Sequence, residues 1–283
     1  MTKFWFRPAV KATLLILSVT GKLSQAETDA HGEPVWEAGI AAAALSYPHY
    51  LGADQQSAYL IPLPYFVYRG EYIQADRGGL RGFLYNSDRL DLRLSLRGSL
   101  PVNSTDNDAR AGMDDLDLLL EAGPVLQVKI FEDASQLLRL DLPVRAAFSL
   151  GNSFLRHEGW TSNPRLYHEA YIGPWTVTSN AGVVFSDRRY HGYIYDVDYN
   201  DVTADRPYYQ SRSGYTAARF SVGARRRVGD YFVGAQLSYY NLNGAENEDS
   251  PLLKQNDYLA ASLFFAWVLG ESRDRVPGHG DSE

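Results

Sequence analysis

Apolar and polar residues alternate without interruption from Leu90 to Leu100, and this run constrains the fold more than any other feature. Leucines occupy one face, and residues such as Asp91 and Arg97 occupy the other. A period of two predicts an extended strand with one apolar face and one wet face. The segments that repeat this pattern are 118–130 and 138–148. We therefore predict an all-β protein.

The predicted strands are long for a soluble protein. They run over about 10 to 14 residues, whereas ordinary strands have about 5 or 6, and a tilted strand that crosses a bilayer needs about 9 to 11. Aromatic residues make up 13% of the chain, with 20 Tyr, and many lie near strand ends, where a membrane interface favours them. A soluble β-sandwich also alternates and stays as the alternative, although these features favour a membrane barrel.

The sequence predicts about twelve strands. They are 36–46, 58–69, 71–76, 79–85, 89–100, 117–130, 136–149, 165–173, 176–186, 214–227, 231–242 and 257–269. The joints after even-numbered strands are short, whereas most joints after odd-numbered strands are long and polar: 47–57, 101–116, 150–164, 187–213 and 243–256. Short turns at one rim and long loops at the other are typical of outer-membrane barrels, whose long loops face outside and whose termini are periplasmic.

Hydrocarbon offers no hydrogen bonds, so a sheet in a bilayer must close into a barrel in which every strand has two neighbours. The expected fold is therefore a closed antiparallel transmembrane β-barrel with lipid and lipopolysaccharide around it. Its lumen would hold a set of charges of both signs that can pair across the interior. These are Asp91, Arg93, Arg97, Glu121, Lys129, Arg139, Asp141, Arg145, Arg219, Arg225 and Arg227. Such a lumen leaves little free bore, so we do not expect a wide general pore.

The first residues predict a secretory signal peptide rather than structure. Three basic residues precede the short apolar run 12–20, and Ala26 ends a small-residue cleavage site before Glu27. That run is too short for a membrane anchor, which needs roughly 20 residues. The predicted organisation is a signal peptide over 1–26, a barrel over 27–270 and a polar C-terminal tail over 271–283. The expected location is the outer membrane of a Gram-negative bacterium.

Composition and motifs exclude several function classes. The net charge of −7 argues against nucleic acid as a partner, because no basic surplus exists to neutralise phosphates. Cysteine is absent, which excludes thiolate metal sites and a lipoprotein anchor. No nucleophile or zinc-protease motif occurs around His49, His157, His168 or His191. The spacing of Asp114, Asp115 and Asp117 does not fit a calcium loop. We expect no enzyme activity, no metal and no cofactor.

Two groups of loop motifs resemble the MipA/OmpV family of outer-membrane proteins, and the likeness covers essentially the whole mature chain. The first long loop has an aromatic-Pro-x-Tyr-x-Gly pattern, and the later loops contain Arg-Pro-Tyr-Tyr and Ser-Pro pairs. It is the order and spacing of the motifs together, rather than any one of them, that is specific. The residues that carry the likeness are Tyr47, Pro48, Tyr50, Gly52, Arg206, Pro207, Tyr209, Ser250 and Pro251.

The resemblance implies a scaffold role. The best-known member of the family is similar to an adaptor that binds a murein lytic transglycosylase and a bifunctional peptidoglycan synthase. Other members are described as porin-like or as adhesins, so a narrow solute channel and a surface binder that uses loop 187–213 stay as alternatives. Arg225, Arg226 and Arg227 are expected to be lumen and interface cations, with a periplasmic docking patch as the alternative.

Overall fold

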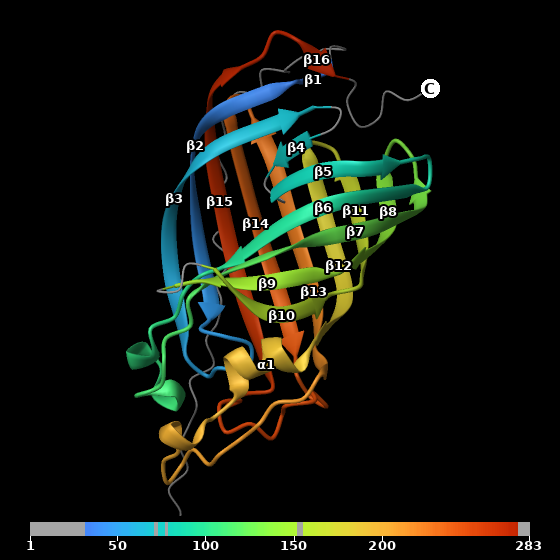
Figure 1. The fold of residues 1–283 in the computed structure, drawn as a ribbon. Coiled ribbons are helices and arrows are strands. Elements are labelled where there is room, and N and C mark those ends of the chain that lie inside the picture. Colours follow the sequence, from blue (N-terminus) through green and yellow to red (C-terminus); the bar gives the residue numbers. More distant parts are fainter. Residues whose placement is uncertain (1–31, 71–72, 77–78, 152–154, 277–283) are drawn as a thin grey trace, which may run out of the picture. The chain divides into compact units, whose positions relative to one another are not determined.

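The structure is a computed structural model that describes residues 32–70, 73–76, 79–151 and 155–276. Long strands wrap around a common interior (Figure 1). In chain order the strands are β1 (Glu33–Pro34), β2 (Trp36–Pro48), β3 (Gln56–Arg69), β4 (Ile73–Asp76), β5 (Gly79–Asn86), β6 (Leu90–Ser99), β7 (Leu118–Glu132), β8 (Gln136–Pro143), β9 (Arg145–Leu150), β10 (Arg156–Ser162), β11 (Arg165–Ile172), β12 (Trp175–Ser186), β13 (Gly214–Val228), β14 (Tyr231–Asn241), β15 (Asp257–Glu271) and β16 (Arg275–Val276). The helix α1 (Arg188–Tyr195) and the 3-10 turns Ser104–Asp106, Asp108–Arg110 and Tyr199–Asp201 lie in the connections.

The main sheet is antiparallel, and most of its strands pair with the next one along the chain. Two interruptions divide longer strands: β8 and β9 both pair with β7, and β10 and β11 both pair with β12. The ladder continues from β12 to β15, and β15 pairs with β2. The sequence of pairings therefore returns to the strand where it began. The predicted all-β antiparallel class is confirmed.

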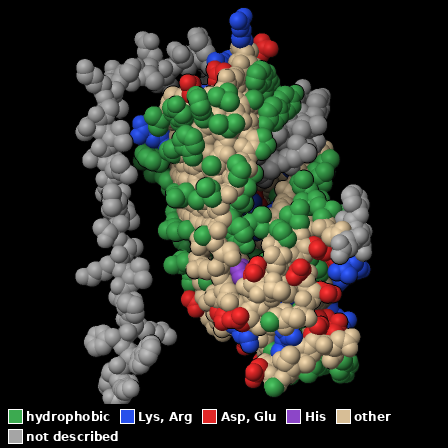
Figure 2. Space-filling model, turned by 90° about the vertical axis from the view of Figure 1, so that its left-hand side faces the viewer, with side chains coloured by type: hydrophobic (Ala, Val, Ile, Leu, Met, Phe, Trp, Pro, Cys, Tyr) green, Lys and Arg blue, Asp and Glu red, His purple; other side chains and the backbone are tan. Residues whose placement is uncertain are grey.

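The alternation of the sequence separates two faces of the wall. Along β15, the side chains of Leu259, Leu263 and Leu269 are exposed, whereas Ala260 and Ala266 are buried inside. Other outward-facing residues of β6, β13 and β14 are also exposed and apolar. Figure 2 shows apolar side chains over the wall, with charged side chains gathered toward its two ends. An apolar outer surface around a polar interior is the arrangement of a membrane barrel.

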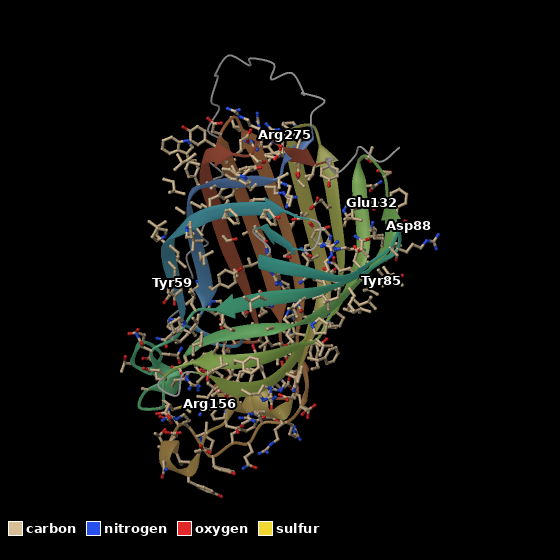
Figure 3. The ribbon with its side chains drawn as sticks, turned by 45° about the horizontal axis from the view of Figure 1, so that its top comes forward. Tyr59, Tyr85, Asp88, Glu132, Arg156 and Arg275 are labelled. Atoms are coloured by element: carbon tan, nitrogen blue, oxygen red, sulfur yellow. The ribbon has the colours of Figure 1, made fainter. Side chains whose placement is uncertain are left out.

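Short turns and long connections lie at opposite ends. The end with the short turns, called the turn rim here, carries Asp88 and Glu132 on neighbouring turns, whereas Arg156 lies toward the other end (Figure 3). One of these turns is held by Asp133, whose carboxylate accepts hydrogen bonds of 2.7 Å from the backbone and hydroxyl of Ser135. These bonds lower the pKa of Asp133, because they favour its ionised form.

Four exposed aromatic residues lie at strand ends on the turn rim, whereas Tyr65, Tyr240 and Tyr258, which also lie near strand ends, are buried. Trp36 lies opposite Tyr68 on neighbouring strands, and Tyr231 lies opposite Trp267. All four side chains are exposed. This position suits rings that are apolar in the body and polar at the edge, since they favour the boundary between hydrocarbon and water.

One predicted loop is largely strand. The sequence pattern assigned 150–164 to a connection, but Arg156–Ser162 forms β10, which pairs with β9. Its register shifts at Gly159, which has φ +117° and lies against Asp187. This bulge breaks the period of two, and Trp160 is the one large apolar residue of the strand, so the alternation that marks the other strands is missing.

Part of the predicted C-terminal tail forms a strand. Arg275 and Val276 form β16, which pairs with Pro34 and Glu33 of β1.

The predicted signal peptide, its cleavage site at Ala26 and Glu27, and residues 277–283 lie outside the described residues. Among the described residues, no helix has the length and apolar character needed to cross a membrane.

Candidate functional site

The long connections pack into a single cap over one end of the wall. We define the cap as residues 49–55, 100–117, 187–213 and 242–256. Its apolar core contains Tyr50, Val102, Leu116, Tyr195 and Leu252, which come from all four connections and are buried. The rings of Tyr50 and Tyr195 pack in a T-shaped arrangement, with 6.3 Å between their centroids. The cap is therefore a folded unit rather than a set of separate loops.

Residues of the family motifs hold this cap together. The hydroxyl of Tyr50 donates to the carbonyl of Leu252 at 2.8 Å, and the hydroxyl of Ser250 donates to the carbonyl of Tyr195 at 2.9 Å. The guanidinium of Arg206 donates to the carbonyls of Ala109 and Ala111 at 2.9 and 3.1 Å. These contacts join connections that are far apart in sequence.

Other motif residues act through the backbone or its immediate surroundings. Gly52 has φ +89°, and a Cβ there would lie 2.7 Å from Cγ of Leu253, so only glycine fits without strain. Pro48 pairs with Gln56 where β2 and β3 leave the cap, and Tyr47 packs on the aromatic cluster below it. Tyr209 donates to the side chain of Asn247 at 3.1 Å. Pro207 and Pro251 lie in the cap beside Arg206 and Ser250.

A buried histidine lies under the cap. His191 of α1 is 1% exposed, and its Nδ1 lies 2.6 Å from the carbonyl of Arg212 and 2.8 Å from Nδ2 of Asn247. Its Nε2 lies 2.8 Å from the hydroxyl of Thr216. Burial lowers the pKa of His191 below its ordinary value of 6.5, against smaller opposing effects of the Arg212 carbonyl and nearby carboxylates. The ring is therefore neutral at pH 7.

Beneath the cap, the interior contains a cavity of about 1220 Å³. Its lining includes Gly70, Asn86 and Pro174 at the turn rim, and none of the described residues that line it belongs to the cap. The cavity therefore extends to the turn rim and ends below the cap. Among the lining residues that the structure describes, ten are Arg or Lys and five are Asp or Glu.

Most of the charges predicted for the lumen line this cavity. They are Asp91, Arg93, Lys129, Arg139, Arg145, Arg219, Arg225 and Arg227. Three others lie outside the lining. Arg97 pairs in register with Glu121 between β6 and β7, and Glu121 accepts a hydrogen bond from Tyr190 of α1 at 3.3 Å. Asp141 is fully buried in the wall beside the cavity.

Asp141 is the centre of the clearest charge network. One of its oxygens accepts from Arg139 at 2.8 Å and from Gln127 at 2.9 Å, and the other accepts from Arg165 at 2.9 Å. A buried carboxylate is stable only when it is paired and hydrogen-bonded. The two arginines therefore compensate Asp141, and Asp141 in turn fixes β8 against β7 and β11.

The sequence pattern missed a second network near the turn rim. Glu37, which is buried, forms ion pairs of 3.0 Å with Arg69 and 3.3 Å with Arg227. Arg225 pairs with Glu169 at 3.3 Å, which was also not predicted. The position of Glu37 on the inward face of β2 is the signal that could have found it.

The arginine triplet is therefore not a free cationic patch. Arg225 and Arg227 point inside and are paired with carboxylates. Arg226 lies 5.7 Å from the ring centre of Trp175, where a cation and an aromatic face attract one another. This arrangement is the one expected of two lumen residues and one interfacial cation.

The four histidines are separate from one another. His49 contacts Ser57 and Asn107, His157 packs on Phe148 and Trp160, and His168 contacts Gln136. Within the described ranges, no group of three or more His, Asp or Glu side chains is arranged to hold a metal ion.

The wall and the cavity define a class of protein: an antiparallel β-structure with an apolar exterior and a charged interior, as in outer-membrane barrels. The family model described as MltA-interacting protein MipA matches residues 40–269. The chain belongs to this family, as the loop motifs predict.

Comparison with individual proteins adds little. No curated protein matches the sequence significantly. Among solved structures, a bacterial polysaccharide outer membrane secretin is 9% identical, with TM-score 0.43 over 83% of this chain and 99% of the secretin chain. The Pseudomonas putida toluene transporter TodX is 9% identical, with TM-score 0.33 over 82% of this chain and 88% of the transporter chain. Such distant likenesses say nothing about function.

Proposed function

We propose that this chain is a closed outer-membrane β-barrel that acts as a scaffold for murein enzymes. The family membership carries the proposal, because the family is named for interaction with MltA, a murein transglycosylase. The ring of strand pairings and the apolar outer face support insertion in a bilayer. A murein transglycosylase and a peptidoglycan synthase are the proposed partners.

The periplasmic partner would dock at the turn rim. In outer-membrane barrels the short turns and the termini face the periplasm, where murein lies. The described part of this rim carries exposed charged side chains, among them Asp88, Glu132 and Arg275. On this surface Arg275 forms an ion pair with Glu271, and Lys129 forms one with Glu132.

Site-specific photo-crosslinking in whole envelopes tests the scaffold. A photoreactive residue at Asp88 or Arg275 is expected to capture a murein hydrolase or synthase, whereas the same residue at Tyr199 on the cap is the matched control. Capture from neither rim position, with the protein correctly inserted, contradicts the scaffold role. Equal capture from Tyr199 contradicts the proposed orientation.

The surface-binder alternative also has an observation in its favour. Tyr199 is 79% exposed and stacks on Tyr208 with 4.3 Å between ring centroids, so the cap presents an aromatic pair to solvent. Substitution of both by Ser is expected to reduce attachment of cells to a surface, if the cap is adhesive, and to leave the heat-modifiable migration of the barrel unchanged. The channel alternative has less support, because the cavity ends below the packed cap.

A further inference from the structure

The basic cavity has a charge opposite to that of the whole chain. The chain carries a net charge of −7, yet basic side chains outnumber acidic ones two to one among the described residues that line the cavity. Positive charge that is concentrated in a concave space with low-dielectric walls raises the local concentration of anions. Most of these basic side chains pair with carboxylates, among them Asp141 behind the lining, so the case for an anionic ligand depends on those that do not.

Two of the arginines are held by neutral partners alone. Nε of Arg145 donates to the hydroxyl of Ser95 at 2.8 Å, and its Nη1 donates to the side-chain oxygen of Asn163 at 2.8 Å. Arg219 donates to the hydroxyl of Ser238 at 3.2 Å, and its Nε is buried without a hydrogen-bond partner. Within the described residues, neither guanidinium forms an ion pair with a carboxylate, although both line the cavity.

An anion would complete this arrangement. Arg145 is 5% exposed, and the guanidinium of Arg219 lies 5.2 Å from the ring centroid of Tyr240. Neither has the compensation that a carboxylate gives to Arg139 or Arg165. Serine and asparagine fix the direction of each guanidinium but leave its charge unbalanced. Arginine also presents paired N–H donors that match carboxylate and phosphate oxygens.

Access from the turn rim identifies the kind of ligand. Gly70, Asn86 and Pro174 border the cavity at that rim, while the cap core covers the opposite end. We propose that the cavity is a closed-ended binding site for a water-soluble solute with two or more carboxylate or phosphate groups, which enters at the turn rim. Arg145 and Arg219 bind its oxyanions. This site goes beyond the scaffold role and does not depend on it.

Calorimetric titration of the full detergent-folded chain tests the site. The probes are citrate and inorganic pyrophosphate, with maltotriose as the neutral probe and spermidine as the cationic one. We expect saturable binding of the anions only, which weakens as salt concentration rises. The double variant Arg145→Gln, Arg219→Gln is expected to bind at least tenfold more weakly, and Arg212→Gln on the cap surface is the matched control. Absence of saturable anion binding, or equal affinity in the double variant, overturns the proposal.

A second measurement serves if the double variant does not fold. The chain has no cysteine, so single cysteines can be labelled cleanly. Thr178→Cys places a thiol in the cavity, and Asn243→Cys places one on the exposed cap. For each variant we compare the reaction rate of an anionic thiosulfonate reagent with that of a cationic one. The ratio of the anionic rate to the cationic rate is expected to be higher at Thr178→Cys than at Asn243→Cys. A ratio equal to the control, or a preference for the cationic reagent, overturns the proposal. Crosslinking from the turn rim is a separate readout, so failure of the site and failure of the scaffold are distinguishable.

Discussion

The hydroxyl of Tyr50 donates a hydrogen bond of 2.8 Å to the backbone carbonyl of Leu252, and this bond joins the first long connection to the last. The ring of Tyr50 is also buried against Tyr195 and lies 5.9 Å below the guanidinium of Arg110. The bond therefore lies at the centre of the cap core, where connections from all parts of the chain meet.

Tyr50→Phe is expected to loosen the cap while it leaves the wall intact. The substitution keeps the packing but leaves the buried carbonyl of Leu252 without its donor, at a cost of about 1–3 kcal/mol. Limited proteolysis of the folded protein measures this effect as faster cleavage within 187–213 or 242–256. Tyr199→Phe, on the exposed surface, is the control. Equal cleavage rates in Tyr50→Phe and the control contradict the assigned role.

The cap is expected to lose stability in mild acid through His191. Its pKa is lower in the folded protein than in the unfolded chain, so the unfolded state binds the proton more readily. The stabilising contribution is therefore fully present above the unfolded pKa of about 6.5 and is lost as pH falls through the lower folded pKa.

Proteolysis of the cap as a function of pH measures this dependence. His191→Gln, which keeps polar atoms near the carbonyl of Arg212 and the hydroxyl of Thr216, is expected to remove most of the difference between pH 7 and pH 5. A pH dependence of the same size in this variant assigns the effect to other groups.

Removal of the charge of Asp141 is expected to destabilise the wall. Asp141→Asn leaves Arg139 and Arg165 without their shared carboxylate. Loss of one partner of a fully buried pair costs about 3–5 kcal/mol. Both arginines are partly exposed to the cavity, so we expect a smaller loss, of about 2 kcal/mol. Urea unfolding in lipid vesicles measures it, with Asp88→Asn on an exposed turn as the control. A loss no larger than that of the control contradicts the role of this network.

A charge on the outer face is expected to impair insertion. Leu263 is 61% exposed on the outward face of β15. If this face contacts lipid, Leu263→Arg costs about 2–4 kcal/mol near the middle of the bilayer. Gln236→Arg puts the same side chain on an inward position and is the matched control.

Folding into lipid vesicles, followed by heat-modifiable migration on gels, distinguishes the two variants. The outward variant is expected to fold less completely, and the inward one is expected to fold like the parent. If the outward variant tolerates arginine as well as the inward one does, then Leu263 does not contact lipid.

The sequence by itself determined the strands and the parity of their faces. Successive side chains of an extended chain point to opposite sides, so the alternation around Leu94 and Arg93 could be read without any knowledge of the neighbours. Where a bulge at Gly159 broke that period, the strand β10 could not be found. Local signals thus predict local structure.

Only the tertiary structure decided what the loop motifs and the lumen charges do. Tyr50 and Leu252 are 202 positions apart, and no local pattern specifies that they meet. Likewise, the alternation of side chains along each strand puts Arg139, Arg145 and Arg219 on the inside. Only the packing of several strands pairs Arg139 with Asp141. The same packing gives Arg145 and Arg219 neutral partners. Contacts between distant segments depend on how the whole chain closes, because each one requires the correct register of every strand between them.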